Sequence, residues 1–472
     1  MSRKFFMMRT ALGWLLVCAS TIGAQESADA PKPALTGDST SAALQPEAPR
    51  DTPDTRPLAG AQNLSLGSQA TSHSFLLPSF GVTTQVQTNP YGSGQANAPD
   101  RISTTYVSGR VALNKISGRS ELLLDYLTGG GFSSDANQGN SIVQSLDFSE
   151  TIRWGRWSQM FGDQFTYLPA SSFGFSGLGG LNNLGVNLGT VGSTPGFRQD
   201  ILPNQSIITT GAPRLSNTVV AQTTYALGYR SSLSFVGAYS VLHFLDAGFQ
   251  DSGTVSIRGG YNYLLSPKNS MSISYGFNRL MLSNSPQGMD EHNVQLSFAR
   301  RITGRLSFQV GAGPDVRIFR APLAGPSTEV SWALYSALLG SYQFRHLDAG
   351  FNYTHSVSAG SGVLPGAQTD MVSGQLGRAF GNWSTTIFSG YSKNRAFQQT
   401  ILNANGISPQ GWFAGAQASR HFVRYGSLFI AYNASGQSSL AAICSLPACQ
   451  TNSLTHTISI GYNWGFRPIV LE

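Results

Sequence analysis

Between His292 and Ile318 the chain alternates apolar and polar residues over two neighbouring stretches. The apolar rows are Val294, Leu296 and Phe298 before the connection Thr303-Gly304-Arg305, and Leu306, Phe308, Val310 and Ala312 after it. A period of two on both sides of a short glycine-containing connection predicts a β-hairpin with one apolar and one polar face.

The same pattern recurs along the chain from about Ser74 onward and predicts an array of hairpins. We expect about eighteen strands, with sixteen as an alternative, because an even number returns both chain ends to one side of a membrane. Their expected centres are Val82, Ser108, Leu124, Phe148, Phe161, Ala221, Phe235, Gly259, Tyr275, Leu296, Val310, Leu338, Phe351, Gly374, Ile387, Ala416, Ile430 and Ile460.

The connections between these strands alternate between two kinds. Tight turns are expected at Gly118-Arg119, Gly155-Arg156, Tyr229-Arg230, Pro267-Lys268, Gly304-Arg305, Arg345-His346, Gly381-Asn382 and Arg424-Tyr425. The others, such as residues 169–214 and 438–452, are longer and rich in Gly, Ser, Asn and Pro. Short turns at one end and long loops at the other are typical of an up-and-down antiparallel barrel in an outer membrane, with periplasmic turns and extracellular loops. In soluble sandwiches and propellers, long and short connections need not alternate.

The composition of the two faces supports a barrel in lipid. Aromatic residues near strand ends would form an interfacial girdle; they include Trp154, Trp332, Tyr342, Phe344, Tyr462 and Trp464. The opposite rows are rich in Gln, Asn, Ser, Thr and Gly, which are too polar to fill a sandwich core. All backbone groups must be paired in lipid, so the sheet must close.

The chain begins with features of an export signal. Arg3, Lys4 and Arg9 precede an apolar run from Ala11 to Ile22, and small residues end at Ala24. We therefore expect residues 1–24 to be a cleaved signal peptide; a lipoprotein signal at Cys18 is a weaker alternative. Residues 25–72 are rich in Pro, Ala and Ser, which predicts a disordered periplasmic segment before a barrel domain over residues 73–472. Such a segment is too short and polar for the plug domain of a large ligand-gated transporter.

Charge is sparse along the whole chain. There are 30 basic and 23 acidic residues, a formal net charge of +7, and only 11% of residues are charged. An average soluble domain has about 25% charged residues. The low value argues against a soluble protein, and the mild, unclustered basic excess argues against nucleic-acid binding.

Two cysteines remain after the expected cleavage, Cys444 and Cys449, in the sequence CSLPAC. In an exported protein such a close pair favours a disulfide within one loop. A metal site is the weaker interpretation, because no set of four His and Cys residues surrounds the pair.

From Ser74 onward the chain resembles a Gram-negative outer-membrane β-barrel protein of the porin type, through its architecture and not through a residue signature. The segment from Thr457 to Phe466 is similar to the C-terminal strand that the barrel-assembly machinery recognises, although Arg467 to Glu472 follow the final aromatic residue. The resemblance implies outer-membrane lipids and that machinery as partners.

Seven charged residues fall on the polar rows and are candidates for lining a pore: Arg110, Asp125, Asp147, Arg153, Arg258, Asp315 and Arg317. Opposite charges around a wet lumen tune ion selectivity. Alternatively, these charges only solvate the wall and pair with neighbouring strands.

The connection over residues 169–214 is far longer than the others, and a loop of that length is usually functional or disordered. In the porins that the chain resembles, one long loop folds inward and narrows the channel. The constriction candidates in this connection are Leu178, Leu181, Asn182, Asn183 and Leu184. The alternative is that the loop caps the outside.

Enzyme chemistry finds little support. His243, His292, His355 and His456 lie near the loop-side strand ends, but no GxSxG, HExxH or paired Cys/His spacing accompanies them. The sequence therefore predicts a non-enzymatic pore for small hydrophilic solutes, without cofactor or metal and with oligomerisation left open. A surface barrel whose loops bind a partner is the main alternative, and a barrel hydrolase is the third.

Overall fold

The computed structural model describes residues 74–88, 100–135, 140–168, 213–246, 249–283, 288–302, 307–320, 328–336, 347–358, 367–396, 410–423, 426–438 and 453–471. Its strands are β1 (Phe75–Thr88), β2 (Arg101–Ser117), β3 (Ser120–Ser133), β4 (Ser141–Trp154), β5 (Trp157–Leu168), β6 (Arg214–Ala226), β7 (Ser231–Phe244), β8 (Ser252–Ser266), β9 (Asn269–Leu282), β10 (Gly288–Arg301), β11 (Ser307–Arg320), β12 (Thr328–Ser336), β13 (Leu347–Ser358), β14 (Ala367–Phe380), β15 (Trp383–Ala396), β16 (Gln410–Val423), β17 (Gly426–Gln437), β18 (Ser453–Gly465) and β19 (Ile469–Val470). None of the described residues belongs to a helix with the length and hydrophobicity needed to cross a bilayer.

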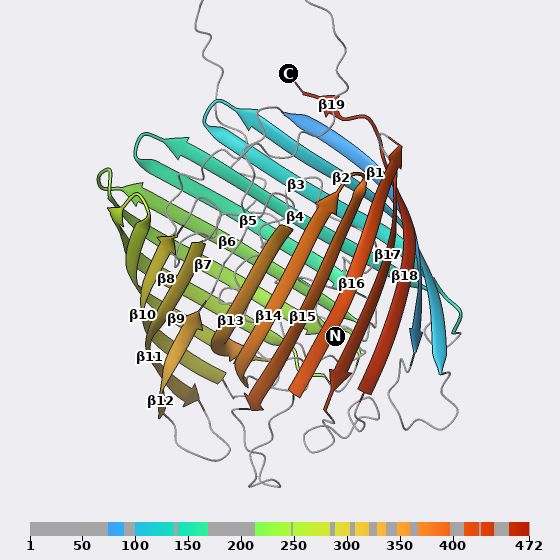
Figure 1. Ribbon diagram of the computed structural model, residues 1–472. Coiled ribbons are helices and arrows are strands. Elements are labelled where there is room, and N and C mark those ends of the chain that lie inside the picture. Colours follow the sequence, from blue (N-terminus) through green and yellow to red (C-terminus); the bar gives the residue numbers. More distant parts are fainter. Residues whose placement is uncertain are drawn as a thin grey trace, which may run out of the picture. The chain divides into compact units, whose positions relative to one another are not determined.

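The strands form one closed antiparallel sheet. Each of β1 to β17 pairs with the next strand along the chain, and β1 also pairs with β18, where Val82 lies opposite Tyr462 (Figure 1). The predicted up-and-down barrel with about eighteen strands is therefore confirmed. The expected strand centres fall within strands, apart from Leu338, which lies outside the described residues.

A short nineteenth strand was not predicted. In β19, Ile469 and Val470 pair with Leu76 and Phe75 at the start of β1, and the amide of Leu471 donates to the carbonyl of Ser74 at 3.0 Å. The residues that follow the last long strand thus return to the sheet. Two residues are too few to show a period, so this pairing has no local sequence pattern.

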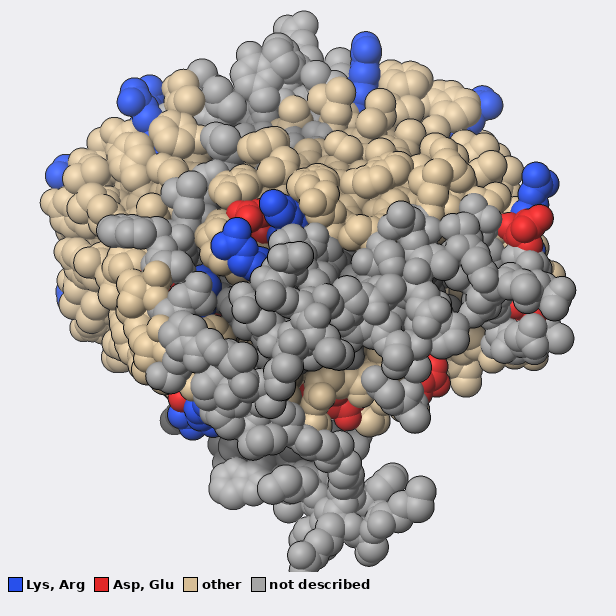
Figure 2. Space-filling model, turned by 90° about the horizontal axis from the view of Figure 1, so that it is seen from below, with Lys and Arg blue, Asp and Glu red and all other residues tan. Residues whose placement is uncertain are grey.

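The alternation of the sequence becomes an outer and an inner face. On β10, Leu296 is 53% exposed on the outer face, whereas the neighbouring Gln295 on the inner face is 5% exposed. A fourteen-residue strand such as β10 rises about 3.3 Å per residue and, tilted by about 45°, spans roughly 33 Å, which matches a hydrocarbon layer of about 30 Å. Viewed from below, Lys and Arg side chains appear at separate points near the edge of the molecule, and one group lies beside acidic side chains nearer the centre of the view (Figure 2).

Several tight turns depend on glycine. Gly118, Gly155 and Gly381 have φ values of +52°, +56° and +55°, in the left-handed region that other residues rarely adopt. Each is the first residue of a two-residue connection between paired strands, as the sequence predicted. The predicted turns at Gly304-Arg305, Arg345-His346 and Arg424-Tyr425 lie outside the described residues.

Candidate functional site

The inner face of the barrel carries dense rows of small polar side chains. They come from adjacent strands and are largely buried: Ser252 and Thr254 on β8, Ser270, Ser272 and Ser274 on β9, and Asn293, Gln295 and Ser297 on β10. These positions alternate with exposed apolar residues on the same strands, so the period of two places them on this face. The inner face of these strands is therefore polar, in contrast to the exposed apolar outer face.

One group of charges lies on the inner face of β2, β3 and β4. Nε of Arg110 donates to Oδ1 of Asp125 over 2.7 Å, and a second contact joins the same two side chains. Asp125 is directly opposite Asp147 in the β3–β4 ladder. This group therefore places two carboxylates beside one guanidinium. Its three members are among the seven residues that the sequence selected.

A second group lies on β9, β10 and β11. Asp315 and Arg317 are two residues apart on β11, so they share the inner face, and Nε of Arg317 donates to Oδ2 of Asp315 at 2.8 Å. Both side chains are fully buried. Glu291 on β10 is also buried on this face and accepts a hydrogen bond from Nδ2 of Asn278 at 3.0 Å.

The other two selected residues are Arg258 and Arg153. Arg258 on β8 is buried on the inner face, directly opposite Val236 on β7 and Gly276 on β9. Arg153 is close to the turn end of β4, with a side chain 63% exposed, and its guanidinium contacts Glu121 at 3.2 Å. It therefore has access to water at the mouth of the barrel.

Glu121 and Glu291 were missed by the sequence analysis. Glu121 has the same parity as the predicted inward residue Asp125 on β3, and Glu291 has the same parity as the buried Asn293 on β10. The period of two could have identified both, because it assigns a face to every residue of a strand. The constriction candidates Leu178, Leu181, Asn182, Asn183 and Leu184, and the cysteines Cys444 and Cys449, lie outside the described residues.

The four rim histidines face outward, and each is bound to a neighbouring side chain. Nδ1 of His243 contacts Asp251 at 2.7 Å and Nδ1 of His355 contacts Asp370 at 2.5 Å. His292 and His456 each contact a tyrosine hydroxyl, that of Tyr275 at 2.7 Å and that of Tyr432 at 2.8 Å. This arrangement suits a polar belt at the membrane boundary. Within the described ranges, no three His, Cys, Asp or Glu side chains gather in a way that would hold a metal ion.

Comparisons with known proteins give structural likeness only. No protein-family model matches the chain, and no curated protein matches it. Among solved structures, OpdQ of Pseudomonas aeruginosa is 10% identical, with a TM-score of 0.42, and the match covers 84% of this chain and 99% of that one. OccAB4 of Acinetobacter baumannii is 9% identical, with a TM-score of 0.41 and the same coverage. The outer membrane channel DcaP of A. baumannii is 12% identical, with a TM-score of 0.37, and the match covers 87% of this chain and all of that one.

Proposed function

We propose that the chain is an outer-membrane pore through which small hydrophilic solutes diffuse passively. The observation that carries this proposal is the closed barrel with an exposed apolar outer face and a polar, charged inner face. A closed sheet satisfies every backbone group in lipid, and an eighteen-stranded barrel is too wide for its wall side chains alone to fill. The proposal includes no catalytic step.

The accessible inner charges are proposed to line the path of the solute. Arg110 and Asp125 are partly accessible, whereas Asp315 and Arg317 are fully buried. An ion in transit would therefore be affected most by the group around Asp125 and Asp147, because the Arg110 and Asp125 side chains are accessible from the lumen. The buried pair would mainly hold the wall.

The N-terminal segments and the cysteine pair are assigned from the sequence, because they lie outside the described residues. Residues 1–24 would be removed on export, residues 25–72 would remain as a periplasmic segment, and Cys444 and Cys449 would form a loop disulfide. Mass spectrometry of exported protein would show a chain that begins near Gln25 with one internal disulfide. Two free thiols would remove the disulfide without affecting the barrel.

Ion current through purified protein in planar bilayers tests the central claim. Stepwise conductance that scales with salt concentration is the expected result for a water-filled pore. A folded protein without current would favour the alternative in which the loops bind an outside partner. Hydrolysis of membrane lipid by the same preparation would instead support a barrel hydrolase.

A further inference from the structure

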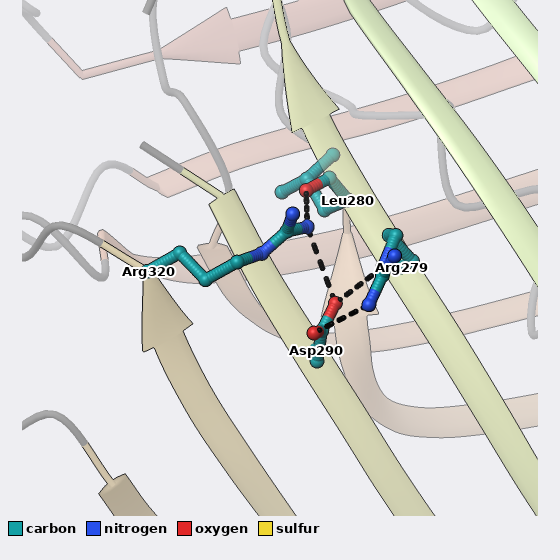
Figure 3. Close-up of polar contacts among 4 residues, drawn as sticks. All are labelled: Arg279, Leu280, Asp290 and Arg320. Atoms are coloured by element: carbon teal, nitrogen blue, oxygen red, sulfur yellow. Dashed lines mark hydrogen bonds and ion pairs between the residues drawn. The ribbon is translucent and has the colours of Figure 1, made fainter. Parts of the chain in front are cut away.

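Two arginines flank one aspartate on the outer face of β9, β10 and β11. Nε and Nη2 of Arg279 donate to the two carboxylate oxygens of Asp290 at 2.9 and 3.0 Å. Nη2 of Arg320 donates to Oδ1 of the same carboxylate at 3.2 Å and to the carbonyl of Leu280 at 3.4 Å (Figure 3). Two guanidinium groups share one carboxylate, so this arginine cluster (Arg279, Asp290 and Arg320) carries a net positive charge.

The cluster lies at the boundary between the apolar wall and the long connections. Arg279 is close to the end of β9, Asp290 is close to the start of β10, and Arg320 is the last residue of β11. Asp290 is opposite the exposed Ile318 in the β10–β11 ladder, and the Arg279 guanidinium is 5.7 Å from the centre of the Phe277 ring. Apolar and aromatic side chains below a pair of cations match the arrangement of a lipid, with its acyl chains below its headgroup.

The arginines keep donors available for a ligand. Their side chains are 44% and 41% exposed, whereas that of Asp290 is 15% exposed. Arg279 binds both carboxylate oxygens of Asp290, whereas Arg320 makes a single, longer hydrogen bond to this carboxylate. Nε of Arg320 is itself buried, so a ligand would meet the terminal nitrogens of this guanidinium. Asp290 therefore positions both guanidinium groups without satisfying them.

We propose that Arg279 and Arg320 bind a phosphate on the headgroup of a phosphorylated glycolipid in the outer leaflet. Guanidinium groups donate charge-assisted hydrogen bonds to phosphate oxygens, and two exposed guanidinium groups that share one carboxylate retain the positive charge to attract such a group. A free phosphate ion would gain only the charge interaction, whereas a lipid also covers the wall near Phe277 and Ile318. The inference rests on the proposed membrane placement, with the long connections outside.

Native mass spectrometry of the full-length protein in detergent tests this site, with purified lipid A as the probe. Arg279→Gln combined with Arg320→Gln should weaken lipid A binding by about tenfold or more, because two charge-assisted contacts are lost. Arg300→Gln is the matched control: Arg300 is exposed on the same face of β10 at the opposite end, and its replacement should leave binding unchanged. Equal binding by the double variant would overturn the proposal.

Two further arms identify the ligand. Dephosphorylated lipid A should bind at least tenfold more weakly than lipid A; equal binding would show that acyl chains alone are recognised and would reject the site. Displacement of lipid A by millimolar inorganic phosphate would assign the site to the free ion and would also reject a lipid site. Heat-modifiable migration establishes that each variant is folded. If the double variant does not fold, Arg279→Gln and Arg320→Gln are measured separately. Conductance of the same preparations separates this inference from the pore, because the pore can be absent while lipid A still binds.

Discussion

Asp125 on β3 and Asp147 on β4 occupy directly opposite positions on the inner face, and Arg110 on β2 binds Asp125 from the other side. Like charges directly opposite each other in a ladder destabilise a sheet, whereas a bidentate guanidinium–carboxylate pair stabilises it. The two aspartates, although neighbours, therefore have different energetic roles.

The first prediction separates these roles by stability. Asp147→Asn should leave the free energy of unfolding unchanged or raise it by up to about 1 kcal/mol, because it removes a repulsion. Asp125→Asn should lower it by about 1.5–3 kcal/mol, because Arg110 loses its charged partner. Urea unfolding in lipid vesicles measures both variants. Equal effects of the two changes would contradict the pairing of Arg110 with Asp125.

The same two variants predict a change in ion selectivity. Each removes a negative charge from the inner face, so the reversal potential in a salt gradient should shift toward anions. An unaltered reversal potential in folded Asp125→Asn and Asp147→Asn proteins would show that ions do not pass near these residues.

Arg317→Ala should reduce the free energy of unfolding, because it leaves the fully buried Asp315 carboxylate without this guanidinium. Urea unfolding in lipid vesicles measures this variant as well.

A third prediction tests which face meets lipid. Ile387 is exposed on the outer face of β15, and the adjacent Thr386 points inward. Ile387→Arg should destabilise the barrel by about 2–4 kcal/mol, the cost of an arginine near the middle of the bilayer. Thr386→Arg is the matched control and should cost clearly less, since it faces a polar interior. Unfolding in vesicles measures the difference, and a reversed order would invert the assignment of faces.

The orientation of the barrel can be tested by labelling cysteines on intact cells. In a protein with Cys444 and Cys449 replaced by serine, Ser285→Cys and Ser361→Cys, both in long connections, should react with an impermeant maleimide from outside. Ser231→Cys, beside a tight turn at the start of β7, should stay unlabelled. The reason is that short turns face the periplasm in barrels of this kind. Labelling at position 231 alone would place the arginine cluster in the inner leaflet.

The long connection predicts a change in conductance. Residues 176–195 lie outside the described residues, and we expect them to occupy part of the lumen, on the basis of their length and their Gly and Leu content. Deletion of Ser176 to Pro195 should raise single-channel conductance and admit larger solutes, because open cross-section limits passage. In protein shown to be folded by heat-modifiable migration, unchanged conductance would place this segment outside the channel as a cap.

The sequence by itself determined the strands, their faces and several of the turns. These features are local: a period of two assigns each residue of β10 to the outer or inner face, and a left-handed turn demands a glycine such as Gly118. The inward positions of Arg110, Asp125 and Asp315 followed from the same rule. No partner strand had to be known for these assignments.

Only the tertiary structure decided which side chains meet. The register between strands brings Arg110 to Asp125 and sets Asp125 opposite Asp147. It also places Arg279 and Arg320, which come from different strands, on the same carboxylate of Asp290. It also seats β19 against the start of β1, across almost the whole length of the described chain. Alternation along one strand is unchanged when its neighbour slides by two residues, so the pattern that identifies a face carries no information about the register between strands.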